Sequence, residues 1–149
     1  MRLQKDNVVL EPTKDLNYIL DISLKYKYNK LNREQARKVL ENFGYKFWQA
    51  YVDGEKSGAV YISYIPKLGY TIDAYKDQRV RNEFKYSRIA GELVIEYFFK
   101  NIFSRLHMAF DSKNKALKLL ARRLKFVEID KIVHKWGEFI VMRRDKWQN

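Results

Sequence analysis

Apolar residues change their spacing several times along the first half of the chain, and each change marks an expected element. A short apolar run ended by Pro12 reads as a strand, and two stretches of helical spacing follow, the second opening on a capping-box pattern at Asn32. From residue 47 the period becomes two, and an Asp-Gly pair after Val52 predicts a hairpin turn. The expected elements are strands 8–12, 47–52, 59–65 and 70–75 and helices 14–26 and 32–43.

The second half of the chain adds two helices and three strands. Ile89, Leu93 and Tyr97 give the first of these helices a broad apolar face that can pack on a sheet. The expected elements are helices 86–99 and 113–124 and strands 106–110, 126–133 and 138–143. Together the elements predict an α/β (α+β) fold. We expect a single domain over residues 1–149, with a mixed, mostly antiparallel sheet of about six to seven strands flanked by about four helices.

Composition excludes several classes of protein. The chain has 149 residues, of which 46% are hydrophobic, so it can bury the core of one domain. No run approaches the roughly 18 apolar residues of a membrane span, and the charged first residues lack the apolar stretch of a signal peptide. We therefore expect a cytoplasmic protein with no membrane partner. Because the sequence has no cysteine and only 2 histidines, we expect no disulfide and no metal site.

Basic residues outnumber acidic ones, and the excess is concentrated towards the C-terminus. The chain has 30 Lys and Arg against 18 Asp and Glu, a net charge of +12. Residues 1–99 hold 17 basic and 13 acidic residues (+4), whereas residues 100–149 hold 13 and 5 (+8). Such a field attracts polyanions, whether nucleic acid, an acidic surface or the phosphates of a cofactor, although it can also serve solubility alone.

Two strand-to-helix junctions carry the strongest motif signal. Strands 70–75 and 106–110 each lead into a helix, and the start of a helix attracts anions because its first N–H groups lack intrahelical partners and its dipole is positive there. This order resembles the coenzyme A half of the GNAT superfamily of acyltransferases, and in particular small divergent members encoded by phages. As a topology the resemblance covers nearly the whole chain.

The resemblance in sequence rests on two motifs, the family's phosphate loop and a later asparagine-to-phenylalanine pattern. The residues aligned with the phosphate loop are Lys85, Arg88 and Ala90, and Asn114 and Phe126 fit the later pattern. Three positions depart from the family. Arg88 stands where the phosphate loop has its first glycine, Ala121 where a tyrosine is common, and Lys125 where the later pattern has glycine.

The resemblance implies an N-acetyltransferase that uses acetyl coenzyme A, with the pyrophosphate on the backbone amides at residues 85–91 and the pantetheine arm against Asn114. The thioester is expected between strands 70–75 and 106–110. Arg88 either adds a charged contact to phosphate, obstructs the site or is an ordinary exposed arginine, and Asn114 can equally cap its helix. The implied cofactor-binding residues are Ile72, Ala74, Lys85, Arg88, Ile89, Ala90, Gly91 and Asn114.

Transfer to an amine also requires proton transfer. An amine with a pKa of about 10.4 must lose a proton, and a carboxylate is a common base. Asp73 interrupts an apolar strand on the face that also carries Tyr75, so the predicted catalytic residues are Asp73 as base and Tyr75 as acid. Tyr70, His107 and water are alternative acids, and loss of catalysis is the remaining alternative. Asp73 has the alternative role of a polar strand residue bonded to nearby backbone.

The helix 113–124 divides into an apolar stripe and a basic stripe whose members recur every three or four residues. The basic residues are Lys115, Lys118, Arg122 and Lys125. They predict a surface for the phosphates of nucleic acid, such as tRNA or DNA, or for an acidic protein, and the alternative is a solvated basic face. The residues that can extend this surface are Trp136, Arg143, Arg144, Lys146 and Trp147.

Two functions from different classes therefore stay open. The retained order of loop and helix, together with Asn114, favours an acetyl coenzyme A-dependent N-acetyltransferase. Arg88 in place of glycine and Ala121 in place of tyrosine favour a catalytically degenerate relative that binds nucleic acid or a protein through its basic surface. The sequence does not identify the acceptor amine.

Overall fold

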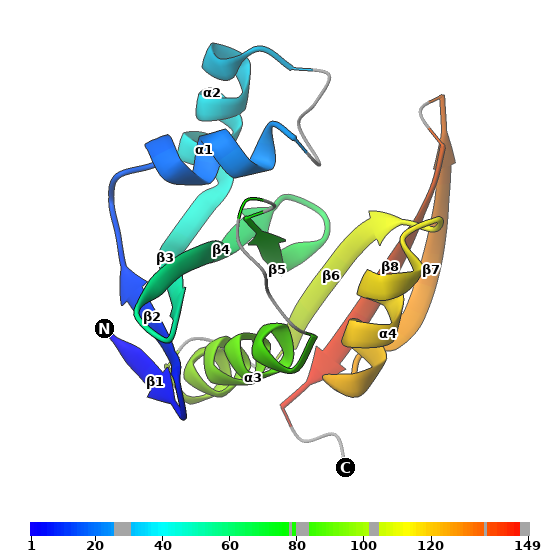
Figure 1. Cartoon of the computed structure of the whole chain (residues 1–149). Helices are drawn as coiled ribbons and strands as arrows, with labels where there is room; N and C mark the ends of the chain where they lie inside the picture. Colours follow the sequence, from blue (N-terminus) through cyan, green and yellow to red (C-terminus); the bar gives the residue numbers. More distant parts are fainter. Residues whose placement is uncertain (26–30, 78, 80–83, 102–104, 136, 147–149) are drawn as a thin grey trace.

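The structure is a computed structural model that describes residues 1–25, 31–77, 79, 84–101, 105–135 and 137–146. Within these residues the chain forms one sheet of eight strands in the order β1-β2-β3-β4-β5-β6-β8-β7 (Figure 1). The strands are β1 (Leu3–Lys5), β2 (Val8–Pro12), β3 (Gly44–Val52), β4 (Glu55–Ile65), β5 (Gly69–Lys76), β6 (Arg105–Asp111), β7 (Val127–His134) and β8 (Gly137–Asp145). All neighbours pair antiparallel except β5 and β6, which are parallel.

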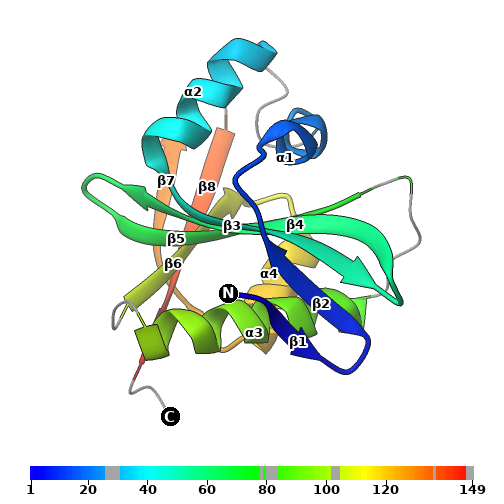
Figure 2. The ribbon, with the colours of Figure 1, turned by 90° about the vertical axis from the view of Figure 1, so that its left-hand side faces the viewer.

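Helices cover both faces of the sheet. They are α1 (Asn17–Ser23), α2 (Arg33–Phe43), α3 (Phe84–Asn101) and α4 (Lys115–Arg123). In two perpendicular views, α1 and α2 lie on one side of the central strands and α3 on the other (Figures 1 and 2). The order of elements produces this arrangement, because α1 and α2 together connect the neighbouring strands β2 and β3, and α3 connects the neighbouring strands β5 and β6.

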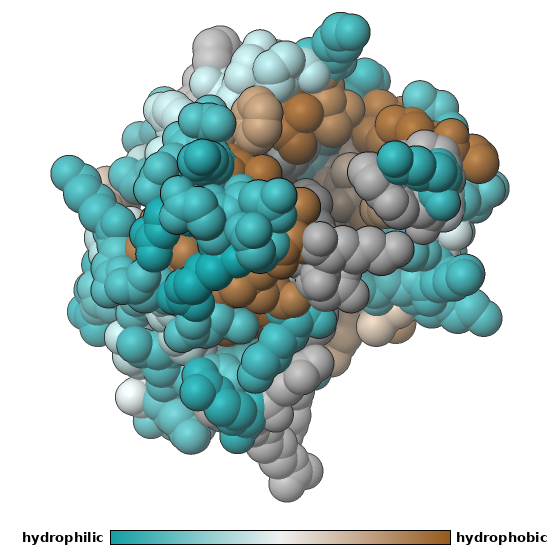
Figure 3. All heavy atoms as spheres, turned by 90° about the horizontal axis from the view of Figure 1, so that it is seen from above, coloured by the Kyte–Doolittle hydropathy of each residue, from teal (hydrophilic) through white to brown (hydrophobic). Residues whose placement is uncertain are grey.

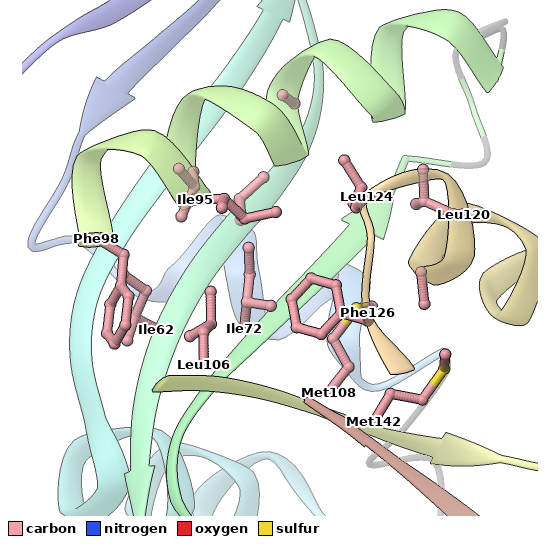
Figure 4. Packing of buried hydrophobic residues seen from close by; sticks show 14 of the residues in the cluster. Ile62, Ile72, Ile95, Phe98, Leu106, Met108, Leu120, Leu124, Phe126 and Met142 are labelled. Atoms are coloured by element: carbon pink, nitrogen blue, oxygen red, sulfur yellow. The ribbon is translucent and has the colours of Figure 1, made fainter. Parts of the chain in front are cut away.

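Two hydrophobic clusters hold the layers together. The larger one joins the sheet to α3 and α4, and Figure 4 shows Ile95 and Phe98 of α3 and Leu124 at the end of α4 among the strand side chains of this cluster. The smaller one joins α1 and α2 to the opposite face and includes Leu40 and Tyr61. The sheet is therefore buried on both faces in its centre, which fixes the positions of the strand ends.

Local sequence explains several element boundaries. The Asn32 side chain accepts a hydrogen bond from the Gln35 backbone N–H at 2.8 Å, and the Gln35 side chain accepts from the Asn32 N–H at 3.0 Å, so the predicted capping box is confirmed. The predicted hairpin turn is confirmed as well. Asp53 and Gly54 have φ angles of 52° and 79°, which suit a turn with two left-handed residues.

The predicted fold class is confirmed, with differences at the N-terminus. The first strand predicted from the sequence begins at residue 8, yet Leu3–Lys5 forms β1 against β2, so the described sheet has one strand more than the upper estimate. The first helix was expected from residue 14 but begins at Asn17. The Thr13 hydroxyl accepts from the Asp15 N–H and the Asp15 carboxylate from the Asn17 N–H, at 3.1 and 3.0 Å, and these turns delay the helix.

Candidate functional site

The parallel strands β5 and β6 separate soon after they meet. A single pair of facing residues, Thr71 and His107, defines their register, whereas β4 pairs with β5 along the whole length of β5. Beyond this pair the two strands diverge towards their carboxyl ends (Figure 1). Parallel strands that separate leave backbone N–H and C=O groups unpaired, so the split is a place where a ligand can complete the hydrogen bonding.

Successive side chains of β5 point to opposite faces of the sheet. Ile72 is buried in the cluster beneath α3, and Ala74, two residues further on the same face, is exposed. Asp73 and Tyr75 face the side of α1 and α2, where Tyr75 packs against the smaller cluster and its ring lies 6.0 Å from that of Tyr61. Both predicted catalytic side chains are half-buried, and the structure brings them to one face of one strand.

The N-terminus of α3 lies beyond the carboxyl end of β5. Lys85 is exposed, with its ammonium group 5.0 Å from the centre of the Tyr86 ring. The Arg88 guanidinium lies 3.2 Å from the Glu92 carboxylate, one turn further along the helix. Ile89 packs at the edge of the large cluster and Ala90 inside it. Among these predicted contacts of the pyrophosphate, Lys85 and Arg88 supply charge and the other side chains supply packing.

Gly91 is the fifth of these predicted positions, and the structure gives it a packing role. A Cβ atom at Gly91 would lie 2.7 Å from Cδ1 of Leu124, the residue that ends α4. The missing side chain therefore permits the close approach of α3 to the end of α4.

Asn114 is the N-cap of α4. Its Oδ1 accepts a hydrogen bond from the Leu117 N–H at 3.0 Å, as the capping alternative predicts. The exposed side chain makes no hydrogen bond through Nδ2 to any other described residue. One asparagine can therefore cap the helix with its oxygen and donate to a ligand with its nitrogen.

The position at which the family often has tyrosine is fully buried. Ala121 is 0% exposed and belongs to the cluster between α4 and the sheet. No residue of α4 carries a hydroxyl or thiol group. Among the residues of β5, Tyr70, Thr71 and Tyr75 carry hydroxyl groups near the split.

His107 faces Thr71 across the only paired position of β5 and β6 in the described residues. Its Nδ1 lies 3.1 Å from the Tyr70 carbonyl oxygen. Burial lowers the pKa of His107, so the neutral ring is favoured. The buried Thr71 hydroxyl makes no hydrogen bond with the described residues. These groups lie at the closed end of the split, and Asp73 and Tyr75 lie towards its open end.

Sequence reasoning missed a polar network at the end of β5. Asp77 is 5% exposed and accepts hydrogen bonds from the Tyr18 hydroxyl at 2.8 Å and from two Arg79 nitrogens at 3.0 and 2.9 Å. The Arg79 guanidinium holds the pKa of the Asp77 carboxyl well below its usual range, whereas burial and the bond to Asp77 raise the pKa of the Tyr18 hydroxyl. The network ties α1 to the end of β5, beside a hollow of about 360 Å³. The Asp-x-Arg spacing was its only sequence signal.

The four basic residues predicted on α4 do not share one environment. Lys118 lies 3.9 Å from Glu128 of β7. Lys115 and Arg122 are exposed, and Lys125 lines a groove beside α3. Of the residues expected to extend this surface, Arg144 and Lys146 line the same groove, and Arg143 lies 3.2 Å from Asp145. Trp136 and Trp147 lie outside the described residues.

Two further observations concern metals and membranes. Within the described ranges, no three histidine, aspartate or glutamate side chains gather closely enough to hold a metal ion. Among the helices that the structure describes, none combines the length and the apolar character of a membrane span.

The end of the molecule that is uppermost in Figure 1 is hollowed, and apolar side chains gather around the hollow (Figure 3).

Comparison with known proteins finds similarity in structure alone. No family model matches the chain, and no curated protein is similar enough in sequence to match. Solved structures do match. A GNAT-family acetyltransferase from Bacillus anthracis has a TM-score of 0.74 at 12% identity, over 99% of this chain and 100% of that chain. The chain has the GNAT acetyltransferase fold.

Two other solved structures with this fold carry more specific descriptions. The ribosomal L7/L12 α-N-protein acetyltransferase RimL, in complex with coenzyme A, has a TM-score of 0.72 at 12% identity, over 97% of this chain and 98% of that chain. A mutant of the spermidine N-acetyltransferase SpeG from Vibrio cholerae has a TM-score of 0.74 at 12% identity, over 95% of both chains. At such identities the likeness establishes the fold, and the two descriptions name different acceptors.

Proposed function

We propose that the protein is an N-acetyltransferase that uses acetyl coenzyme A and transfers the acetyl group to an amine. The observation that carries this proposal is the split between β5 and β6, with their single pairing at Thr71 and His107 and with α3 and α4 beginning beyond their carboxyl ends. The likeness to solved GNAT acetyltransferases, one of them in complex with coenzyme A, supports it.

The residues around the split fit such a cofactor. The first N–H groups of α3, with Lys85 and Arg88 nearby, would hold its pyrophosphate. Asn114 would donate from Nδ2 to its pantetheine arm, and unpaired backbone groups of β5 at Ile72 and Ala74 would complete its contacts. When bound, acetyl coenzyme A supplies an activated acetyl group as a thioester.

Asp73 and Tyr75 would handle the protons. A carboxylate on the face towards α1 and α2 can take a proton from an incoming ammonium or amine group, and a phenol on the same face can give one to the leaving group. Tyr75 takes the place of the family tyrosine because Ala121 has no titratable group. The expected location in the cytoplasm and the expected origin in a phage belong to this proposal and rest on the sequence.

Binding and turnover test the proposal separately. Titration calorimetry with acetyl coenzyme A should show binding, and a hundredfold excess over the dissociation constant should stabilise the folded chain by about 2.7 kcal/mol. Turnover can be followed by release of free thiol against a panel of peptide N-termini and polyamines. The chain has no cysteine, so every thiol detected comes from the cofactor. Absence of binding would exclude the enzyme, and binding without turnover on any amine would favour the degenerate binding protein.

A further inference from the structure

A second hollow lies away from the split, on the flank of α3. It is a groove of about 690 Å³ between one face of α3, the turn that ends α4 and the end of β8. Arg144 belongs to the end of β8 that pairs with the first residues of β6, where it faces Leu106, and Lys146 follows directly after β8. The split between β5 and β6 widens beyond His107, towards the carboxyl end of β6, and Arg88 is a groove residue that the proposed function also places near the pyrophosphate.

The lining of this groove is strongly basic. Six of its residues carry positive charge, and only Glu92 and Glu96 carry negative charge. The basic residues are Arg88, Lys100, Arg123, Lys125, Arg144 and Lys146. Glu92 already lies 3.2 Å from Arg88 and 3.9 Å from Lys5, so much of its charge is compensated. The groove therefore presents a positive field that its own carboxylates do not neutralise.

Arg144 is the most informative residue of the groove. Its guanidinium is half-buried, donates to the Leu124 carbonyl oxygen at 3.1 Å and lies 5.5 Å from the centre of the Phe99 ring. No described carboxylate lies within ion-pair distance of it. Burial accordingly lowers the pKa of Arg144. Glu92, beyond ion-pair distance, opposes this shift only in part. A partly desolvated, oriented guanidinium with no carboxylate in contact is costly, and a bound anion would offset that cost.

The shape of the groove limits the kind of anion. Along α3 the lining runs from Arg88 to Lys100, twelve residues or about 18 Å of helix. Basic residues line the groove at both ends and on the wall opposite α3. The groove therefore suits a ligand that carries several negative charges along its length. Its apolar lining consists of Ile95, Phe99 and Leu124, and two of these are buried. A protein partner would need a larger apolar contact area.

We propose that this groove binds the phosphate backbone of a single-stranded nucleic acid, as a binding function separate from acetyl transfer. A concave groove can follow one backbone, whereas a duplex presents a convex surface. Arg144 at the floor would form a charge-assisted hydrogen bond to one phosphate. Lys100 and Arg123 would contact others from opposite walls. Contacts of this kind release counterions and give an affinity that falls with salt.

Fluorescence anisotropy with a labelled single-stranded RNA tests this assignment on the full chain. The variant K100E/R123E reverses two exposed groove charges, and K38E/K131E makes the same change in net charge on α2 and β7. We expect K100E/R123E to weaken binding at least tenfold and to flatten the slope of log affinity against log salt by about 1.4, two contacts of about 0.7 each. The control should lose less than threefold and keep its slope. Circular dichroism should show both variants folded.

Arg144 provides a second variant with a different readout. Arg144→Met keeps much of the side-chain volume and removes the charge, so it should weaken RNA binding about tenfold while leaving the melting temperature unchanged or raised. A lowered melting temperature together with unchanged RNA affinity would give Arg144 a purely structural role and overturn its assignment.

Other outcomes would overturn the proposal as a whole. An equal loss of affinity in K100E/R123E and in K38E/K131E would show that net charge alone attracts RNA. Tighter binding of a duplex of equal length, or of a polyglutamate peptide, would assign the groove to another ligand. A loss of coenzyme A affinity in K100E/R123E with no RNA binding would place cofactor phosphates in the groove. Because acetyl transfer should be unchanged in K100E/R123E, a failure here is distinguishable from a failure of the enzymatic function.

Discussion

Gly91 of α3 and Leu124 at the end of α4 are in contact because one of them lacks a side chain. An ideal Cβ on Gly91 would lie 2.7 Å from Leu124 Cδ1 and 3.3 Å from Cδ2, and Leu124 is 3% exposed. Alanine is normally better than glycine inside a helix by about 1 kcal/mol. Overpacking a buried contact costs about 1–3 kcal/mol. The two effects oppose each other, so the sign of the stability change measures how tightly the helices meet.

We predict that Gly91→Ala destabilises the fold by about 1 kcal/mol in urea unfolding, since overpacking exceeds the gain in helix propensity. A double-mutant cycle with Leu124→Ala isolates the contact. Leu124→Ala alone should cost about 2–5 kcal/mol, and it should cost less in the Gly91→Ala background because the new methyl group then has room. A stabilising Gly91→Ala substitution would show that Leu124 moves aside freely.

Local patterns in the sequence predicted much of the fold. The capping box at Asn32 and Gln35 and the turn at Asp53 and Gly54 involve residues a few positions apart, and the structure contains both. Such motifs satisfy backbone groups locally, so their outcome depends little on the rest of the chain. The missed strand β1 has no such pattern. It is three residues long and exists because β2 offers an edge with which it can pair.

Contacts between distant residues could not be predicted in the same way. Arg144 meets Leu124 and Phe99 only because β8 ends beside both α3 and α4. Likewise Tyr18 and Asp77 are 59 positions apart and form one hydrogen bond. The sequence also grouped Lys118 with Lys125 by helical spacing, whereas Lys118 lies near Glu128 and Lys125 lines the groove. Helical spacing predicts which residues share a side of a helix and leaves open what that side faces.

The two proposed roles of Asn114 can be separated by substitution. Aspartate caps a helix as well as asparagine does, but an ionised carboxylate cannot donate a hydrogen bond. We predict that Asn114→Asp keeps the stability of the fold within about 0.5 kcal/mol and weakens coenzyme A binding about tenfold, by calorimetry. Asn114→Ala should lose both the cap, about 1 kcal/mol, and the affinity. Equal affinity in Asn114→Asp and the unmodified chain would leave Asn114 as a cap alone.

The network of Tyr18, Asp77 and Arg79 should make stability depend on pH. The pKa of Asp77 is lower in the folded chain than its usual value of about 3.9, chiefly because Arg79 donates to the carboxylate. Its contribution to stability is therefore present above that pH and is lost as the pH falls below it. We predict that Asp77→Asn costs about 2 kcal/mol at pH 7.

Urea unfolding of the Asp77→Asn variant at pH 7 and at about pH 3 measures this dependence. The difference from the unmodified chain should shrink at the lower pH, because the unfolded chain then binds a proton at Asp77 that the folded chain does not. Asp130→Asn, at an exposed position, is the matched control and should change stability little at either pH. A constant penalty for Asp77→Asn at both pH values would mean that the charge of Asp77 does not matter.

Asp73 and Tyr75 lie on one face of β5, and their proposed roles predict different kinetic signatures. Asp73→Asn keeps the size of the side chain but removes the base, so kcat should fall about a hundredfold or more while coenzyme A affinity stays within about twofold. Tyr75→Phe removes only a hydroxyl. The kcat of this variant should fall most with acceptors for which departure of the coenzyme A thiolate limits the rate. Coenzyme A titrations of each variant serve as the control for binding. Unchanged turnover in Asp73→Asn would remove Asp73 from the mechanism, and the amine would then have to lose its proton to water.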